Sequence, residues 1–244
     1  MIERTNFLSY PVDNLNYYEL INFVKNTINK NEKHFLAVLN ANKIYLMSKN
    51  PSLREAINNA SIILPENAIN IGMFLLRKPL KQMNVGGYPV MLKLLEIANL
   101  YDYSVYFLGS KELVLKILYN KLKMTYPELN ICGLKDGYYK DKDEEDIINE
   151  INKVKPNILF VGMGSPKQEF FIHKNFERLN VNIVIGVGGS FNVIAGLEKP
   201  APKWTKFGLE WLYRALQDPK KFKRYSIVNT FFVFSFIKYL VFKK

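Results

Sequence analysis

The sequence predicts an α/β fold in which a mostly parallel sheet is flanked by helices. Between residues 100 and 190, apolar runs of strand length alternate with segments whose apolar positions recur every three or four residues. Strands that alternate with helices favour parallel pairing, because each helix returns the chain to the starting edge of the sheet. With 244 residues, 48% of them hydrophobic, the chain is long enough to bury such a core.

Six apolar runs are the candidate strands. The first two frame a predicted helix at residues 50–60, where Asn50 is a suitable N-cap and Pro51 stands in the first turn. The other four are separated by the helical segments KELVLKILYNKLKM, DEEDIINEINKV and PKQEFFIHKNFERL. In chain order the six runs are FLAVL (35–39), SIIL (61–64), SVYFLG (104–109), LNICG (129–133), NILFVGMG (157–164) and VNIVIGVGG (181–189).

The composition changes after about Gly196. The net charge is +12, and between Lys199 and Lys244 eleven Lys or Arg face two acidic residues, so this segment alone carries +9. A basic terminal segment indicates an anionic partner, which is nucleic acid, lipid headgroups or a phosphorylated ligand. We therefore divide the chain into an α/β core at 1–197 and a basic, amphipathic helical appendage at 198–244.

The end of the appendage is predicted to associate with a membrane. The run from Ile227 to Phe242 is rich in phenylalanine and contains one charge, Lys238. Its 16 residues make a helix of about 24 Å, short of the ~30 Å hydrocarbon core, so we expect it to lie in the interface with the preceding lysines facing anionic lipid. The alternative is a helix packed on the core or on a second subunit. Because the aromatic residues do not alternate with basic ones, a nucleic-acid partner is disfavoured.

The cysteine and histidine content argues against metal or thiol chemistry. Cys132, the single cysteine, lies in an apolar run and is interpreted as a core residue in a reducing, cytoplasmic protein. His34 and His173 have no partner at metal-ligand spacing, so no metal is expected. The N-terminal segment MIERTNFLSY lacks the basic start and apolar run of a signal peptide.

The stretch ILFVGMGSPKQEFF, residues 158–171, is the strongest candidate for a ligand site. We expect Ser165 to cap the following helix, Pro166 to occupy its first position and Gln168 to complete a capping box. These roles leave the glycines and Lys167 unexplained.

The glycines of this stretch favour an anionic ligand. Gly162 and Gly164 permit close backbone approach, and a helix start beside Lys167 attracts negative charge. A second cluster, GVGGSFNVIAG at 186–196, follows the next strand and supplies Gly188 and Gly189. Two adjacent loops at the carboxyl edge of a parallel sheet predict a site for a phosphate-containing ligand.

The glycine pattern of the chain argues against two other kinds of nucleotide site. The G-x-G here has no third glycine, which argues against a nicotinamide dinucleotide, and the nucleotide-triphosphatase motif G-x-x-x-x-G-K-[ST] is absent.

Since no Ser-His-Asp or Cys-His pattern is present, a catalytic acid or base has to be a carboxylate. Glu66, directly after SIIL, is the best placed, and a solvated loop glutamate is the alternative.

Several motifs together resemble the WecG/TagA/CpsF glycosyltransferases, glycosyltransferase family 26. They are LNAN, NPSLREAINNASIILPEN, VYFLGS, DGYY, LFVGMGSPKQE, GVGGSFNVIAG and GLEWLYRALQDPKKFKR, and they span almost the whole chain. The resemblance implies a Rossmann-like core and a C-terminal appendage that touches both the membrane and the active site. It implies an inverting, metal-independent and cofactor-free transfer from a UDP-sugar to a polyprenyl-diphosphate-linked sugar. The reaction would take place on the cytoplasmic membrane face, in the synthesis of cell wall, capsule or another surface glycan. It implies no nucleic-acid partner and leaves a homo-oligomer open.

The resemblance also assigns site residues. Glu66 falls on the family's catalytic aspartate, and Asn67 replaces the glycine that follows it. Glu66 is therefore the expected general base. The expected substrate-binding residues are Asn40, Gly109, Ser110, Gly164, Lys167, Gln168, Gly188, Gly189, Asn192, Arg214, Lys221 and Arg224.

Some positions depart from the family pattern. Val38 stands in place of a threonine, Asn192 in place of an aspartate, and an arginine expected near Met83 and Asn84 is missing. Because unpaired polar groups in a closed site discriminate strongly between substrates, these changes leave the donor sugar open. They also leave open an inactive or partner-dependent homologue.

Overall fold

A wholly parallel, six-stranded sheet forms the centre of the computed structural model, which describes residues 2–81, 86–200 and 222–242 together with 202, 205, 212, 213 and 216. The strand order is β4-β3-β8-β7-β5-β6, and each strand coincides with one of the six predicted runs. The prediction of a mostly parallel sheet is therefore confirmed. The strands are β3 (His34–Leu39), β4 (Ile62–Pro65), β5 (Val105–Gly109), β6 (Ile131–Lys135), β7 (Ile158–Gly162) and β8 (Ile183–Gly186).

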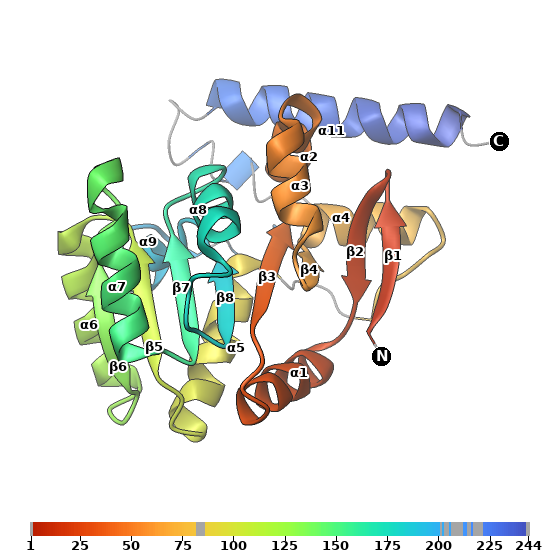
Figure 1. Cartoon of the computed structure of the whole chain (residues 1–244). Coiled ribbons are helices and arrows are strands. Elements are labelled where there is room, and N and C mark those ends of the chain that lie inside the picture. The colour runs from red at the N-terminus through yellow and green to blue at the C-terminus, as the bar shows by residue number, and fades with distance from the viewer. Residues whose placement is uncertain are drawn as a thin grey trace.

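Helices cover both faces of this sheet (Figure 1). Along β5, Val105 and Phe107 enter one core while Tyr106 and Leu108 enter the other, as the alternation of a strand requires. The first core is closed by α1 (Tyr17–Asn29), α5 (Gly87–Leu100), α6 (Glu112–Thr125) and α9 (Ser190–Ala195). The second is closed by α2 (Ala41–Lys49), α3 (Pro51–Asn58), α4 (Asn67–Leu75), α7 (Glu144–Val154), which follows the short η1 (Asp141–Asp143), and α8 (Lys167–Asn175).

Side-chain caps fix several of these helix starts. Asn50 accepts a hydrogen bond from Leu53 N at 3.1 Å with Pro51 at the first helical position, which confirms the predicted start of α3. Asn16 and Glu19 form a capping box at the start of α1.

An N-terminal hairpin is an addition that the sequence did not predict. Strands β1 (Glu3–Phe7) and β2 (Tyr10–Asn14) pair antiparallel around Leu8 and Ser9, both with positive φ (48° and 68°). Asp13 joins the hairpin to the sheet, since its carboxylate accepts from Ile63 N at 2.7 Å and from the Arg4 guanidinium at 2.8 Å. The hairpin packs against the second core, which includes Phe7.

The last helix, α11 (Phe222–Phe242), lies across the end of the molecule toward which β3, β7 and β8 point (Figure 1). It has 21 residues, about 32 Å, so the prediction of a shorter helix was wrong: the helix begins five residues earlier, within the basic segment. By length and composition α11 could cross a membrane.

The inner face of α11 packs on the protein. Val228 is buried, and Phe232 and Phe236 stack on Phe7 with ring centroids 5.7 and 6.0 Å apart. The alternative that this helix packs on the core is therefore correct for its inner face. The helix predicted around FGLEWLYRALQ lies largely outside the described residues, and the division into core and appendage stays a prediction.

Candidate active site

A cavity of about 430 Å³ opens at the carboxyl ends of the strands, beneath the first turns of α11. Four strand-following segments contribute to its lining, those after β3, β4, β7 and β8, together with the start of α5. The carboxyl edge is where open α/β sheets bind ligands, and the volume suits a small-molecule substrate. The segments are represented by Asn40, Glu66, Gly164, Gly188 and Tyr88.

Glu66 lines this cavity between two helix starts. Its N–H donates to Leu39 O at 2.9 Å, which places it directly after β4 and at the N-cap position of α4. Its Oε1 lies 3.5 Å from the N–H of Gly87, the first residue of α5. Gly86 allows this approach, because a Cβ there would meet Glu66 Cγ at 3.0 Å. The partial positive charges of both helix starts favour a carboxylate at this point.

The start of α8 differs from the expected cap. The Ser165–Pro166 peptide is cis, the helix begins at Lys167, and no side chain caps it. Ser165 instead donates to Glu169 Oε2 at 2.6 Å, and Gln168 reaches the next loop. The predicted capping box is wrong, because Ser165 bonds to the Glu169 side chain and Gln168 bonds to Glu169 and to Gly188 N, so neither side chain caps the backbone of the helix start.

A buried ion pair lies beneath the cavity and orients Gln168. Lys43 and Glu169 are joined at 2.8 Å with side chains 5% and 1% exposed. Gln168 Nε2 donates to Glu169 Oε1 at 2.8 Å, so its Oε1 is left to accept from Gly188 N at 3.0 Å. The three segments that carry Lys43, Gln168 and Gly188 are thereby held in one arrangement.

Glu169 remains charged despite its burial. Burial opposes ionisation, but the Lys43 ammonium and the hydrogen bonds from Lys43, Ser165 and Gln168 outweigh it and hold the pKa of Glu169 below its ordinary value.

The glycines divide into two groups. Gly164 (φ +76°) and Gly188 (φ +55°) line the cavity, and a Cβ added at either position would have no neighbouring atom within 4 Å, so both leave the backbone open to a ligand. Gly162 has a packing role instead, because a Cβ there would meet the Phe191 ring at 2.7 Å. The expectation that Gly162 faces the ligand is therefore not met, and the Gly188 N–H is already engaged by Gln168.

The chain matches the glycosyl transferase WecG/TagA/CpsF family over residues 5–244. It belongs to this family. A relative from Bacillus spizizenii, named N-acetylglucosaminyldiphosphoundecaprenol N-acetyl-beta-D-mannosaminyltransferase, is 33% identical over 223 residues, covering 88% of this chain and 85% of the relative. Enzymes of the same name from Bacillus subtilis and Staphylococcus aureus are each 30% identical, covering 88% and 93% of this chain and 84% and 90% of their own lengths. This membership decides against a nicotinamide-dependent oxidoreductase.

Of the residues that the resemblance to the WecG/TagA/CpsF family assigned, one group lines the cavity. It comprises Glu66, Asn40, Gly164, Gln168, Gly188, Gly189 and Arg224. Asn40 also caps α2 by accepting from Lys43 N at 2.9 Å. Arg224 comes from α11, where its guanidinium lies 5.2 Å from the Tyr225 ring centroid. Arg214 and Lys221 lie outside the described residues.

Four of the family-assigned residues are not among the lining residues of this cavity. Ser110 donates to Asn192 Oδ1 at 3.2 Å, and a Cβ on Gly109 would collide with the backbone of Gly162. Lys167 turns to the DGYY segment, where its ammonium donates to Gly137 O at 2.7 Å and lies over the Tyr139 ring. The structure thus gathers Gly109, Ser110, Lys167 and Asn192 around β5 and β7 rather than around Glu66.

Several residues that line the cavity were not predicted from the sequence. Lys43, Tyr88, Ser190, Glu198, Tyr225 and Asn229 contribute to the cavity. Tyr225 and Asn229 lie one turn apart on α11, which is the only pattern that could have indicated them. Within the described part of the chain, no group of three or more His, Cys, Asp or Glu could hold a metal ion. Cys132 is half-buried, and burial raises the pKa of its thiol.

Proposed function

We propose that this family member transfers a sugar, with inversion and without a metal ion, from a UDP-sugar to a polyprenyl-diphosphate-linked sugar. The observation that carries the proposal is the half-buried carboxylate of Glu66, which lines a cavity at the carboxyl edge of the sheet beneath the first turns of α11, where Arg224 also lines it. The named relatives act on N-acetylglucosaminyldiphosphoundecaprenol and transfer N-acetylmannosamine. The same acceptor and an N-acetylhexosamine donor are therefore the first candidates for this chain.

The proposed step forms one bond and breaks another. A hydroxyl oxygen of the acceptor sugar attacks the anomeric carbon of the donor from the face opposite UDP, while the anomeric carbon–oxygen bond to UDP breaks. Glu66 takes the hydroxyl proton, a role that suits a carboxylate that lies between two helix starts.

The negative charge that develops on departing UDP requires cationic partners. Arg224 supplies one from α11, and Arg214 and Lys221 are the further candidates from the sequence. The open backbone at Gly164 supports a phosphate beside the cavity wall. Gln168, held by Glu169, would position the donor or the acceptor.

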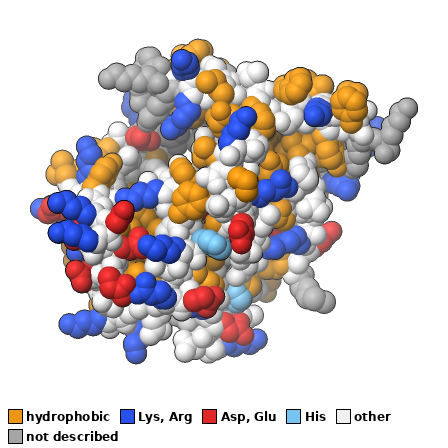
Figure 2. All heavy atoms as spheres, turned by 45° about the horizontal axis from the view of Figure 1, so that its top comes forward, with side chains coloured by type: hydrophobic (Ala, Val, Ile, Leu, Met, Phe, Trp, Pro, Cys, Tyr) orange, Lys and Arg blue, Asp and Glu red, His pale blue; other side chains and the backbone are white. Residues whose placement is uncertain are grey.

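A location on the inner face of the plasma membrane is part of the proposal. The outer side of α11 exposes Ile227, Phe234, Ile237 and Val241, which recur at intervals of seven, three and four residues, with fractional exposures of 47–66%. We call these four residues the outer stripe. Figure 2 shows hydrophobic side chains gathered along this helix with Lys and Arg between them. One face of α11 on the protein and an apolar face outward suit a helix that lies in the membrane interface.

The direct test is incubation of the protein with a panel of UDP-sugars and N-acetylglucosaminyldiphosphoprenol, with products measured by mass spectrometry. We expect one donor sugar to be added to the acceptor with release of UDP, in the presence of a chelator as in its absence. No product with any donor would contradict the proposed function, and a product abolished by the chelator would contradict only its metal independence.

A further inference from the structure

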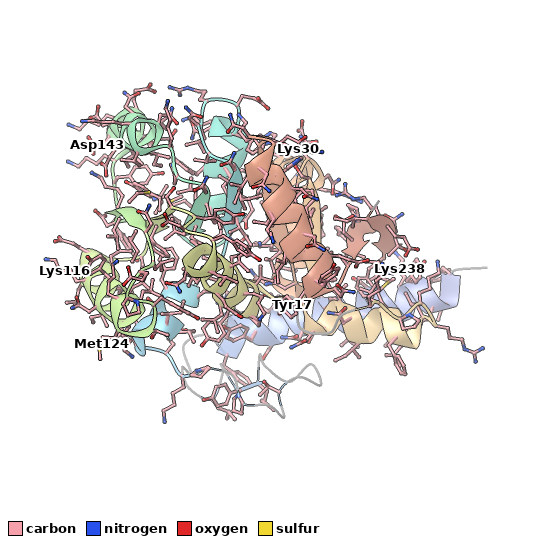
Figure 3. All side chains as sticks on the ribbon, turned by 90° about the horizontal axis from the view of Figure 1, so that it is seen from below. Tyr17, Lys30, Lys116, Met124, Asp143 and Lys238 are labelled. Carbon is pink, nitrogen blue, oxygen red and sulfur yellow. The ribbon has the colours of Figure 1, made fainter. Side chains whose placement is uncertain are left out.

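A second hollow, separate from the candidate active site, lies between the hairpin and the end of α11. It has a volume of about 530 Å³. Figure 3 shows Lys238 of α11 beside this hairpin. We call this hollow the hairpin groove, and it is lined by Leu8, Ser9, Tyr10, Ile44, Ser235, Lys238, Tyr239 and Phe242.

The chemistry of the hairpin groove suits an apolar chain. Leu8, Ile44 and Phe242 provide aliphatic and aromatic walls, and the rings of Tyr10 and Tyr239 add to them. Lys238 is exposed, so its methylene stem can line the groove while its ammonium reaches the headgroup layer. The polar groups of the lining are the hydroxyls of two serines and two tyrosines and the Lys238 ammonium, so most of the wall is still carbon.

The hairpin groove and the candidate active site share a flank of α11. Successive helical residues turn by about 100°, so Arg224 in the active-site cavity points within roughly 40° of Ser235, Lys238 and Phe242. Along the helix axis, Arg224 and Phe242 are about 27 Å apart.

Between Arg224 and Ser235, the residues on this flank of α11 are Val228 and Phe231, both apolar. Phe231 lies on the same flank and meets the Tyr45 ring edge-on at 5.3 Å. On α2 the two hollows are lined by neighbouring residues, Lys43 for the cavity and Ile44 for the groove. The acceptor is the one ligand of the proposed reaction with both a phosphorylated sugar for the cavity and a long apolar chain to follow this flank.

We infer that the hairpin groove binds the polyprenyl chain of the lipid-linked acceptor while its diphosphate-sugar end occupies the candidate active site. The inference rests on the proposed function for the identity of the acceptor. The outer stripe of α11 contacts the bilayer, whereas the flank that lines the hairpin groove binds one polyprenyl chain. Acceptors with long chains are therefore preferred over acceptors that share the same sugar diphosphate on a short chain.

The test compares two acceptors, one with a farnesyl-length chain and one with an undecaprenyl chain, both in detergent micelles so that no bilayer contributes. Ser235→Trp fills the groove, and Thr230→Trp places the same ring on the exposed outer side as a control. In Ser235→Trp we expect the KM for the long acceptor to rise about tenfold, as the loss of two buried methylene-sized groups implies, with the short acceptor unaffected. Thr230→Trp leaves the preference for the long chain intact.

Phe242→Ala provides a second variant, which removes one wall instead of filling the groove and is expected to weaken the same preference. Both variants are checked for an unchanged thermal transition. A long-chain preference that survives in both folded variants overturns the inference. An equal loss of activity for both acceptors also overturns the inference, because it indicates a general defect of the enzyme. If Ser235→Trp instead changes only the response to added phospholipid, the groove holds an acyl chain and the inference is wrong.

A titration without sugar transfer separates this inference from the proposed function. Undecaprenyl diphosphate and farnesyl diphosphate are titrated against the full-length protein, and binding is followed by intrinsic fluorescence. Tighter binding of the longer chain that is lost in Phe242→Ala supports the groove even if no UDP-sugar is used. Equal affinity for both diphosphates overturns the groove even if transfer is observed.

Discussion

At the scale of single residues, the candidate site is organised by the carboxylate of Glu169, which does not itself line the cavity. The amide nitrogen of Gln168 is directed to Glu169, which leaves the amide oxygen for Gly188 N. Lys43 balances the charge of Glu169 at 2.8 Å. Glu169 and Lys43 therefore act as positioning residues, and Glu66 is the carboxylate that lines the cavity and is proposed to meet the substrate.

Glu66→Gln is expected to reduce sugar transfer by roughly two to four orders of magnitude, because the amide cannot accept the acceptor's proton. UDP affinity should stay within about twofold, since the replacement is nearly isosteric. Steady-state kinetics and calorimetric UDP binding check the two parts. Glu112→Gln, on α6, is the matched control and should leave turnover unchanged, because Glu112 is exposed and does not line the cavity. Turnover of Glu66→Gln near that of the wild type would remove Glu66 as the base.

Glu169→Gln is expected to destabilise the fold by about 3–5 kcal/mol, because Lys43 keeps a buried charge without a carboxylate partner. Lys43→Met combined with Glu169→Gln removes both charges and should recover most of the loss. Denaturant unfolding of the two variants measures this. A double variant no more stable than the single one would show that the charge pair is not the cause.

The stability of the wild type should also depend on pH through Glu169. Its pKa in the folded protein is below the ordinary 4.5, so the ion pair contributes fully above about that pH and its contribution is lost as the pH falls through the folded value. The free energy of unfolding should therefore fall more steeply below pH 4.5 in the wild type than in the double variant. Parallel slopes for the two proteins would contradict the assignment.

The sequence indicated Glu66 but not Lys43. Glu66 directly follows an apolar strand, which places it at the carboxyl edge of the sheet, and the family pattern carries a carboxylate there. Lys43 reads as an ordinary helical lysine, and its burial depends on Glu169 on another helix. Ser165 was assigned a cap because its neighbours fit one, whereas its hydroxyl is used by the same carboxylate.

At the scale of elements, the apolar runs predicted the strands because a strand buried on both faces is apolar throughout, as β4, β5, β7 and β8 are. The edge strand β6 is only partly buried, and its predicted run began two residues early. The hairpin escaped prediction because its turn, Leu8–Ser9, lacks the asparagine or glycine that usually marks positive φ. The start of α11 was placed too late because its first turn is basic. The helix faces the protein through the residues that follow, since Tyr225 and Val228 line the cavity and Val228 is buried.

The outer stripe of α11 is expected to hold the protein on anionic vesicles. Phe234→Ser with Ile237→Ser should lower the partition coefficient about 100-fold, because two exposed apolar side chains no longer leave water. Vesicle flotation measures the effect. Leu113→Ser with Met124→Ser, two apolar residues on α6 that are at least as exposed, is the control and should bind as the wild type does. Equal loss in both double variants would show that the contact is not specific to α11.

At the scale of the whole molecule, α11 serves the core, the cavity and the hairpin groove together. Its inner face stacks on Phe7, its first turns line the cavity through Arg224 and Tyr225, and its last turns line the groove. The expected appendage is thus partly a structural helix of the core. Removing it has to affect stability as well as function.

Truncation after residue 198 is therefore expected to abolish both sugar transfer and vesicle binding while the parallel sheet still folds. Because the ring of Phe7 and the face of α2 lose their cover, about 2–3 kcal/mol of stability should be lost, which lowers the thermal transition by roughly 5–10 °C. Circular dichroism follows the sheet and the transition, and UDP-sugar turnover follows the function. A truncated protein that transfers sugar at the full rate would contradict the role of Arg224 and its helix. One that unfolds completely would show that α11 belongs to the core rather than to a separable appendage.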